Sequence, residues 1–227
     1  MADPLPTPAS VDAHAGQATR VIAVRHGETA WNVETRMQGQ LDIPLNEKGR
    51  WQAARVAAAL ADEALDAIYS SDLLRASQTA DALARAQALP LVADRGLRER
   101  CFGVFEGFTY ADIGRHWPDE TQRWRARDAT FAPARGESLR DFYDRCVAVA
   151  ERLAEQHAGS AIVWVTHGGV LDCLYRAAAR MALDAPRTWT LDNASINRLL
   201  HGDQGLMLIG WGDIHHLDQS PDDAREA

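Results

Sequence analysis

Val21-Ile22-Ala23-Val24 is a short apolar run that stops abruptly at Arg25-His26-Gly27. Runs of this kind, rich in β-branched residues, are typical of a parallel strand whose two faces are both covered. A second such run, Ala161-Ile162-Val163-Trp164-Val165, stops at Thr166-His167-Gly168-Gly169. The sequence therefore predicts two buried parallel strands, each of which ends at a histidine followed by glycine.

Strands and helices alternate around these two runs. Further strands are expected at Ala67-Ile68-Tyr69-Ser70 and around Leu89–Val92, with a C-terminal hairpin formed by Ile196–His201 and Leu206–Trp211. Helices are expected from Glu47 to about Ala61 after the N-cap Asn46, from a cap at Ser71 or Asp72 to about Ala88, from a capping box at Ser138, and from about Val170 to Met181. This order predicts an α/β fold, a three-layer α/β/α sandwich on a mostly parallel sheet.

The segment of about residues 104–136 breaks this rhythm. It holds Trp117, Trp124 and Phe131 among many charged residues. This composition indicates an insertion that folds as a lid over the carboxyl ends of the strands. We therefore expect a single domain over residues 20–213. An Ala/Pro-rich stretch over residues 1–19 is expected to be a flexible leader, and residues 214–227 a polar, acidic tail.

The composition excludes several classes of protein. The 227 residues carry 24 Lys+Arg against 32 Asp+Glu, and the resulting net charge of −8 argues against a nucleic-acid partner. No run approaches the roughly 18–20 apolar residues of a membrane span, and the leader lacks the features of a secretory signal. The cysteines at 101, 146 and 173 form neither a disulfide framework nor a zinc pattern. We expect a cytoplasmic protein, a monomer or a homodimer, that acts on a small molecule.

Charged and nucleophilic side chains follow the predicted strands. Ligands of open α/β sheets bind at the carboxyl ends of the strands, where His26, His167, Arg25 and, from the helix after Ser70, Arg75 would meet. Two guanidinium forks match the oxygens of a phosphoryl group. One unprotonated imidazole can attack phosphorus, while the other stabilises the developing charge. Glu99 is the best candidate for the general acid.

Each of these residues also has a structural alternative. A lone histidine often caps a strand end, a lone arginine on a helix is usually solvated, and Asn32 can simply form a turn. Glu28 and Asp72 are less suited to acid chemistry than Glu99, since acidic residues at helix starts are commonly caps. His215-His216 has no third ligand in view and is expected to lie on the surface.

Several motifs, in order, resemble the signatures of the histidine phosphatase superfamily, the phosphoglycerate mutase-like proteins. The resemblance covers roughly residues 20–212 and rests on Val24-Arg25-His26-Gly27-Glu28-Thr29-Ala30-Trp31-Asn32, Gln38-Gly39, Asp42-Ile43-Pro44-Leu45, Ser70-Ser71-Asp72-Leu73-Leu74-Arg75-Ala76, Leu97-Arg98-Glu99, Phe102-Gly103-Val104-Phe105-Glu106-Gly107, Gly136-Glu137-Ser138 and Thr166-His167-Gly168-Gly169.

This resemblance implies a role for each matched residue. His26 would be the nucleophile that becomes phosphohistidine, Arg25 and Arg75 would hold the phosphoryl group, and His167 would complete its pocket. Glu99 would donate a proton and later act as the base. No metal ion and no cofactor are implied. Asn32 and the amide of Gly168 would add hydrogen bonds to the phosphoryl oxygens, and Gln38 and Gly39 would lie nearby in the phosphate-binding site.

Two features separate phosphatases from mutases in this family. Mutases carry a longer segment between the acid and the second histidine, and they tend to have asparagine where this chain has Gly169. The resemblance therefore favours a metal-independent phosphomonoester hydrolase for small phosphorylated metabolites. The alternative is a mutase that depends on 2,3-bisphosphoglycerate. A non-catalytic phospho-ligand binder is disfavoured, because that route normally deletes the nucleophile or the acid, and both are present.

Arginines around the lid suggest how a substrate could be selected. Arg100 and Arg125, with Arg127, loosely resemble mutase positions that hold a substrate carboxylate. The alternative is that Arg123, Arg125 and Arg127 form an exposed face of the insertion, paired with Glu120 and Asp128. The first reading predicts that these arginines contact anionic substrates.

Overall fold

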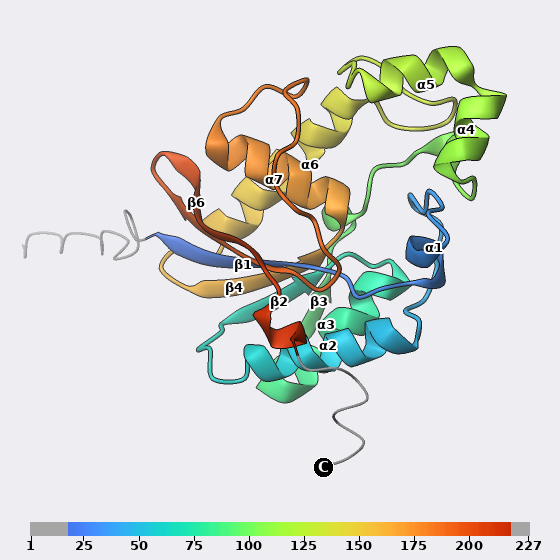
Figure 1. Cartoon of the computed structure of the whole chain (residues 1–227). Coiled ribbons are helices and arrows are strands. Elements are labelled where there is room, and N and C mark those ends of the chain that lie inside the picture. Colours follow the sequence, from blue (N-terminus) through green and yellow to red (C-terminus); the bar gives the residue numbers. More distant parts are fainter. Residues whose placement is uncertain (1–17, 219–227) are drawn as a thin grey trace, which may run out of the picture.

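A computed structural model describes residues 18–218, and its core is one six-stranded sheet with the order β3-β2-β4-β1-β5-β6 (Figure 1). The first four strands in the chain are mutually parallel, and β5 runs antiparallel to both of its neighbours. The mostly parallel sheet and the C-terminal hairpin predicted from the sequence are thus confirmed. The strands are β1 (Thr19–Arg25), β2 (Ala67–Ser70), β3 (Leu91–Ala93), β4 (Ala161–Thr166), β5 (Ile196–Gly202) and β6 (Gly205–Asp213).

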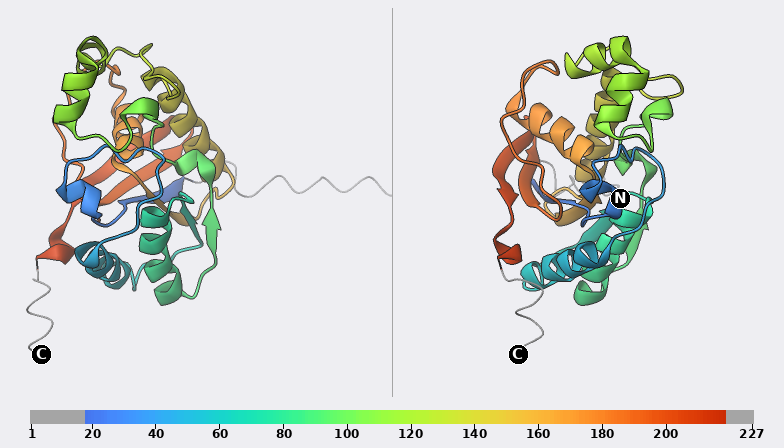
Figure 2. Two further views of the ribbon diagram at one scale, coloured as in Figure 1. Left: turned by 90° about the vertical axis from the view of Figure 1, so that its right-hand side faces the viewer. Right: turned by 45° about the vertical axis from the view of Figure 1, so that its right-hand side comes forward.

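Helices cover both faces of this sheet, which makes the three-layer sandwich (Figures 1 and 2). Alternate residues of β1 enter opposite cores: Val21 packs with the α6–α7 layer, and Ile22 packs with the α2–α3 layer. This explains why both strand runs are apolar at every position. The helices are α1 (Ala30–Val33), α2 (Glu47–Ala59), α3 (Leu74–Gln87), α4 (Tyr110–His116), α5 (Pro118–Arg125), α6 (Leu139–Glu155) and α7 (Gly168–Ala179), with 3-10 turns η1 (Arg95–Leu97), η2 (Gly103–Phe105) and η3 (His215–Leu217). Among the described residues, no helix is long and apolar enough to cross a bilayer.

Two of the predicted helix caps are confirmed, and one is wrong. Asn46 accepts a hydrogen bond from the amide of Gly49 at 2.7 Å, and Ser138 accepts one from the amide of Asp141 at 3.0 Å. The cap of α3, predicted at Ser71 or Asp72, lies instead at Leu73, whose side chain cannot cap. Tertiary contacts override the local signal here. A distant carboxylate, Asp42, accepts the hydrogen bond of the first helical amide at 2.6 Å, while two arginines bind Asp72.

The inserted segment forms a small layer of its own beside the carboxyl ends of the parallel strands, as Figures 1 and 2 show for α4 and α5. Phe105 is fully buried there among Ile113, Phe131 and two partly buried tryptophans.

At the chain ends, Thr19, expected in the leader, is the buried first residue of β1, and η3 lies within the expected tail. Residues 1–17 and 219–227, on which the remaining expectations for leader and tail fall, lie outside the described residues.

Candidate active site

The pairing of β1 with β4 brings the two histidines together. Arg25 and Thr166 are partners at the ends of these parallel strands, so the residues that follow, His26 and His167, leave the sheet side by side. Their ring centroids are 5.1 Å apart. Sequence analysis predicted this meeting from the parallel order of two strand ends, and the structure places it where α7 begins, at Gly168.

The hydrogen bonds of His26 define its reactive nitrogen. Its Nδ1 lies 2.7 Å from the carbonyl oxygen of Gly27, which can only accept, so Nδ1 carries the proton and Nε2 keeps its lone pair. The side chain is buried at 3% exposure. Burial, followed by the charges of Arg75 and Arg25, lowers the pKa of His26 well below its usual range. His26 is therefore neutral near pH 7, the state in which an imidazole can act as a nucleophile.

Two arginines flank this nitrogen from different elements. Arg75, in the first turn of α3, is 1% exposed and is fixed by hydrogen bonds to the carbonyls of Leu41 at 2.9 Å and Gly39 at 2.6 Å. Arg25 donates from Nη1 to the carbonyl of Leu191. Burial lowers the pKa of Arg75 to about 10, so it keeps its positive charge at neutral pH.

Several side-chain nitrogens at this point are buried without a hydrogen-bond partner among residues 18–218. They are the Nε atoms of Arg25 and Arg75 and both ring nitrogens of His167. Burial, then the charge of Arg75, lowers the pKa of His167 well below its usual range. An unsatisfied buried polar group costs about 1–3 kcal/mol, and several of them around one point suit an anion that would satisfy them together.

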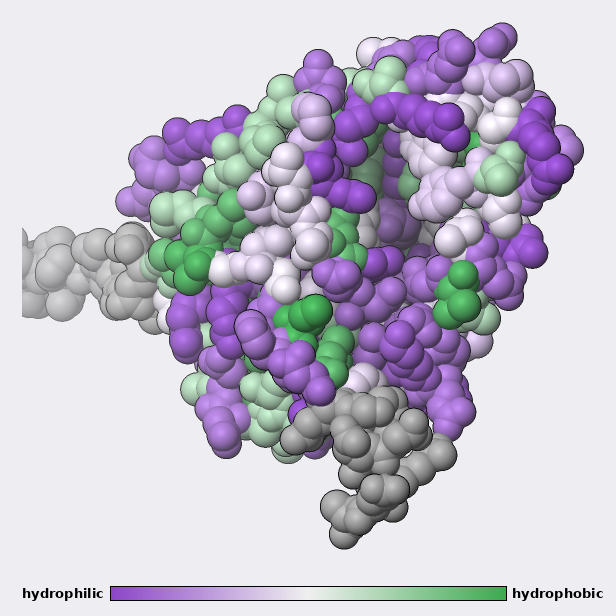
Figure 3. Space-filling model, viewed as in Figure 1, coloured by the Kyte–Doolittle hydropathy of each residue, from purple (hydrophilic) through white to green (hydrophobic). Residues whose placement is uncertain are grey.

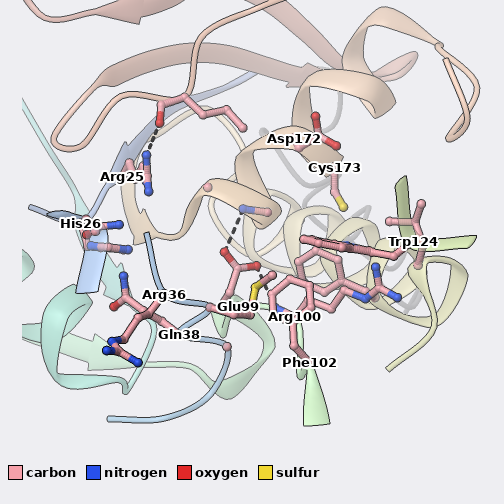
Figure 4. A pocket seen from close by; sticks show the side chains of 18 of the residues that line it. Arg25, His26, Arg36, Gln38, Glu99, Arg100, Phe102, Trp124, Asp172 and Cys173 are labelled. Atoms are coloured by element: carbon pink, nitrogen blue, oxygen red, sulfur yellow. Dashed lines mark hydrogen bonds between the residues drawn. The ribbon is translucent and has the colours of Figure 1, made fainter. Parts of the chain in front are cut away.

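Glu99 is held against the start of α7. Its Oε2 accepts the amide N–H of Gly169 at 2.9 Å, and its Oε1 accepts the amide N–H of Arg100 at 2.8 Å (Figure 4). Each oxygen keeps a second lone pair that can take a proton. Glu99, His26 and Arg75 line the same cavity.

Gly169→Ala is expected to move this carboxylate. A Cβ at Gly169 would lie 2.1 Å from Oε1 of Glu99, and the helical backbone itself would accept alanine without strain. We expect kcat for alkyl phosphates to fall about 10- to 100-fold with a small change in Tm. Steady-state kinetics and thermal unfolding measure both. Gly210→Ala is the control, because its Cβ would meet only the Cβ of Arg198 at 4.0 Å. Full activity of Gly169→Ala would contradict the assigned position of Glu99.

The buried histidines also predict the pH dependence of stability. In the unfolded chain they titrate near pH 6.5, whereas burial keeps His26 and His167 neutral in the folded protein at lower pH. Below about pH 6.5 the unfolded state therefore binds more protons, and the free energy of unfolding decreases by up to about 1.4 kcal/mol per pH unit for each histidine. Carboxylates of lowered pKa, such as Asp72, titrate below this window.

Urea unfolding at pH 7.5, 6.0 and 5.0 measures this slope. His167→Asn should lose one such contribution and give a shallower decrease between pH 6.5 and 5. A slope equal to that of the wild type would show that His167 is protonated in the folded protein.

The cavity has a volume of about 370 Å³ and contains most of the predicted binding residues. Figure 3 shows the surface hollowed between the lid and the rest of the molecule, with hydrophilic residues around the opening. Asn32 lines it, but its Oδ1 already accepts from the amide of Thr29 at 3.0 Å, so Nδ2 is the group that it can offer a ligand. The predicted residues Gln38, Gly39, Gly168 and Arg100 also line the cavity.

The lid arginines do not all behave as the sequence suggested. Arg125 is exposed and is not part of the cavity wall, which corrects its prediction as a substrate-binding residue; α5 turns it toward Gly114 instead. Arg123 is paired with Asp128 at 2.7 Å, as the alternative reading expected. Arg127 does line the cavity.

Two cavity arginines, Arg36 and Arg187, were missed by the sequence analysis. Arg36 stands next to the matched Gln38 motif, and that neighbourhood could have drawn attention to it. Arg187 lies in the irregular segment between α7 and β5, where no periodicity and no motif mark it.

The residues set aside as structural have structural partners. Glu28 binds Asn46 at 2.9 Å and Lys48 at 3.0 Å, and His215 is exposed and pairs with Asp213 at 2.9 Å. Its neighbour His216 is half-buried. Within residues 18–218, no group of three His, Cys, Asp or Glu side chains is arranged to hold a metal ion.

Comparison with known proteins accounts for this arrangement. The family model described as the histidine phosphatase superfamily (branch 1) matches residues 21–214. The chain belongs to the histidine phosphatase superfamily. As a member of it, the chain is similar to phosphoglycerate mutase-like protein 4 of Arabidopsis thaliana, with 40% identity over 88% of this chain and 87% of the relative. It is also 35% identical to the metal-independent phosphoserine phosphatase of the same plant, over 88% of this chain and 84% of that protein.

Solved structures of this superfamily agree with the fold. YhfR of Bacillus stearothermophilus superposes with a TM-score of 0.83 at 34% identity, over 88% of this chain and all (100%) of that one. A mycobacterial glucosyl-3-phosphoglycerate phosphatase, solved with VO3, gives a TM-score of 0.76 at 34% identity, over 86% of this chain and 99% of that one. The α/β sandwich and the family predicted from the sequence are both confirmed.

Proposed function

We propose that this member of the histidine phosphatase superfamily is a metal-independent phosphomonoester hydrolase that works through a phosphohistidine at His26. The observation that carries the proposal is the state of His26: a buried, neutral imidazole whose Nε2 is free, beside two arginines and a second histidine whose ring nitrogens have no partner among residues 18–218. Nucleophile, positive charge and hydrogen-bond donors are thereby gathered around the position of one phosphoryl group.

In the first step, the lone pair of Nε2 forms a bond to phosphorus. The bond from phosphorus to the ester oxygen breaks, and that oxygen takes its electron pair together with a proton from Glu99. Arg25, Arg75 and His167 stabilise the charge on the equatorial oxygens. The products of this step are the free alcohol, a Glu99 carboxylate and phosphohistidine.

In the second step, the Glu99 carboxylate accepts a proton from a water molecule as its oxygen bonds to phosphorus. The bond from phosphorus to Nε2 breaks and returns its electrons to the imidazole. Inorganic phosphate leaves, and Glu99 is again protonated. The two amide hydrogen bonds of Glu99 fix the carboxylate for both proton transfers without blocking its remaining lone pairs.

Hydrolysis is proposed rather than mutase chemistry because of the contact between Gly169 and Glu99. A larger residue at 169, such as the asparagine expected of mutases, has no space beside the carboxylate, since even a Cβ would overlap Oε1. Relatives with both names exist, among them the phosphoserine phosphatase and a probable phosphoglycerate mutase, GpmB, of Escherichia coli at 35% identity. The proposal therefore needs a test that separates the two reactions.

Phosphate release in the presence of EDTA is that test. The panel is an aryl phosphate, 3-phosphoglycerate and several sugar phosphates, and 3-phosphoglycerate is also run with 2,3-bisphosphoglycerate and assayed for 2-phosphoglycerate. The proposal predicts phosphate release despite chelation. Isomerisation with little release would identify a mutase, and binding of phosphate without turnover would identify a non-catalytic protein.

The proposal includes a reducing compartment and a small-molecule partner. Cys101, Cys146 and Cys173 are all free thiols, which supports a cytoplasmic location. A cavity of about 370 Å³ suits a small phosphorylated metabolite. No cofactor is needed for the steps above.

A further inference from the structure

The cavity is far more positive than the chain as a whole. Its wall holds six arginines and only two acidic residues, Glu99 and Asp172, although the complete chain has a net charge of −8. Two of the arginines belong to the phosphoryl site. The other four raise the question of what else the cavity binds; they are Arg36, Arg100, Arg127 and Arg187.

Three of these four are committed to the protein. Arg100 donates to the carbonyls of Glu137 at 2.9 Å and Phe131 at 2.9 Å. Arg127 donates to the carbonyl of Leu183 at 2.6 Å and to Asp172 at 2.7 Å. Arg36 is bound to Glu34 at 2.5 Å and to the carbonyl of Gly107 at 3.0 Å. These arginines anchor loops around the cavity.

Arg187 differs from all three. It is exposed at the cavity wall, and its guanidinium makes no hydrogen bond or ion pair within residues 18–218. Its charge reaches the phosphoryl site. The pKa of Arg25 is lowered mainly by burial, and the positive charge of Arg187 lowers it further.

The backbone around Arg187 is fixed on both sides. Four residues later, the carbonyl of Leu191 accepts the hydrogen bond of Arg25, so this segment is tied to the phosphoryl site itself. Trp189 is buried and stacks on Tyr175 with ring centroids 3.9 Å apart. On the other side, the carbonyl of Leu183 is held by Arg127. An uncommitted guanidinium thus projects from an anchored segment.

We propose that Arg187 selects substrates whose leaving group carries a second anionic group, a carboxylate or a second phosphate, by binding that group while the phosphoryl group occupies the site at His26. The proposal rests on the hydrolase function proposed above. It transfers to the segment after α7 the role that the sequence suggested for the lid residue Arg125. The planar guanidinium fork suits both kinds of anion.

Matched substrate pairs test this role. 3-Phosphoglycerate is compared with glycerol 3-phosphate, which has a CH₂OH in place of the carboxylate, and fructose 1,6-bisphosphate is compared with fructose 6-phosphate. For each pair, the ratio of kcat/KM values measures the preference for the second anion. The two pairs separate a carboxylate from a second phosphate as the group that is read.

Arg187→Gln is expected to lower this ratio about three- to tenfold for at least one pair. The main effect should be a higher KM for the substrate that carries the second anionic group, because the contact is made equally in the ground and transition states. Arg187→Lys should restore part of the preference. Two control variants remove the same charge elsewhere: Arg125→Gln on the exposed face of the lid, and Arg20→Gln near the opposite end of β1. Both should keep the wild-type ratio.

An unchanged ratio for both pairs in Arg187→Gln would overturn the inference while leaving the hydrolase function intact. An equal fall in all three glutamine variants would also overturn it, since overall charge would then be the cause. If the wild type released no phosphate from any substrate, the proposed function itself would fail. These outcomes are distinguishable in one set of assays.

Discussion

Replacing His26 with alanine is expected to abolish phosphate release, with kcat/KM reduced by at least about 10³-fold for every substrate. Among the described residues, His167 also has unpartnered ring nitrogens near Arg25 and Arg75, but it is fully buried and does not line the cavity, whereas His26 does. Loss of the nucleophile therefore removes the covalent route altogether. Phosphate release from an aryl phosphate, the most reactive substrate of the panel, gives the most sensitive measurement.

A control separates this loss from a general effect of removing a histidine. His215→Ala changes an exposed histidine outside the cavity and should retain wild-type kinetics. Circular dichroism and Tm should show that His26→Ala is folded. A folded His26→Ala protein with full activity would rule out the covalent mechanism.

Glu99→Gln is expected to have the second-largest effect, with a dependence on the leaving group. For alkyl phosphates, whose alkoxide needs a proton, kcat should fall about 10²- to 10⁴-fold. An aryl phosphate needs little help to lose its phenolate, so phosphorylation of His26 should continue. Its hydrolysis should slow, because the base is missing. The amide also faces two N–H donors, those of Gly169 and Arg100, and can accept from only one of them.

Rapid-mixing kinetics distinguish the two halves of this prediction. The Glu99→Gln protein should release one equivalent of phenolate in a burst and then turn over slowly, whereas an alkyl phosphate should show no burst. Equal reductions for aryl and alkyl phosphates, without a burst, would mean that Glu99 is not the proton donor.

Patterns that depend on local sequence and burial were predictable in this chain. The runs at Val21 and Ala161 became the two central parallel strands, since covered strands must be apolar on both faces. The cap at Ser138 was predictable because it bonds three residues along its own chain. The cap of α3 was not, because its acceptor, Asp42, lies 32 residues away.

The same distinction applies to the candidate site. Four residues at element ends, His26, His167, Arg25 and Arg75, could be predicted to converge, since parallel strands place their carboxyl ends together. From the sequence, Arg187, which lines the cavity, could not be distinguished from Arg125, which does not. Arg125 and Arg187 both lie in polar segments, and only the folded course of residues 180–195 turns Arg187 toward the cavity.

A covalent intermediate at His26 is the central feature of the proposed mechanism. The measurement is mass spectrometry of the protein after rapid mixing with an aryl phosphate in EDTA and a quench that preserves acid-labile phosphate, using Glu99→Gln to slow hydrolysis. We expect one phosphoryl group per chain, located on His26 and absent from His26→Ala. Turnover without any phosphorylated protein, or a phosphoryl group on another residue, would contradict it.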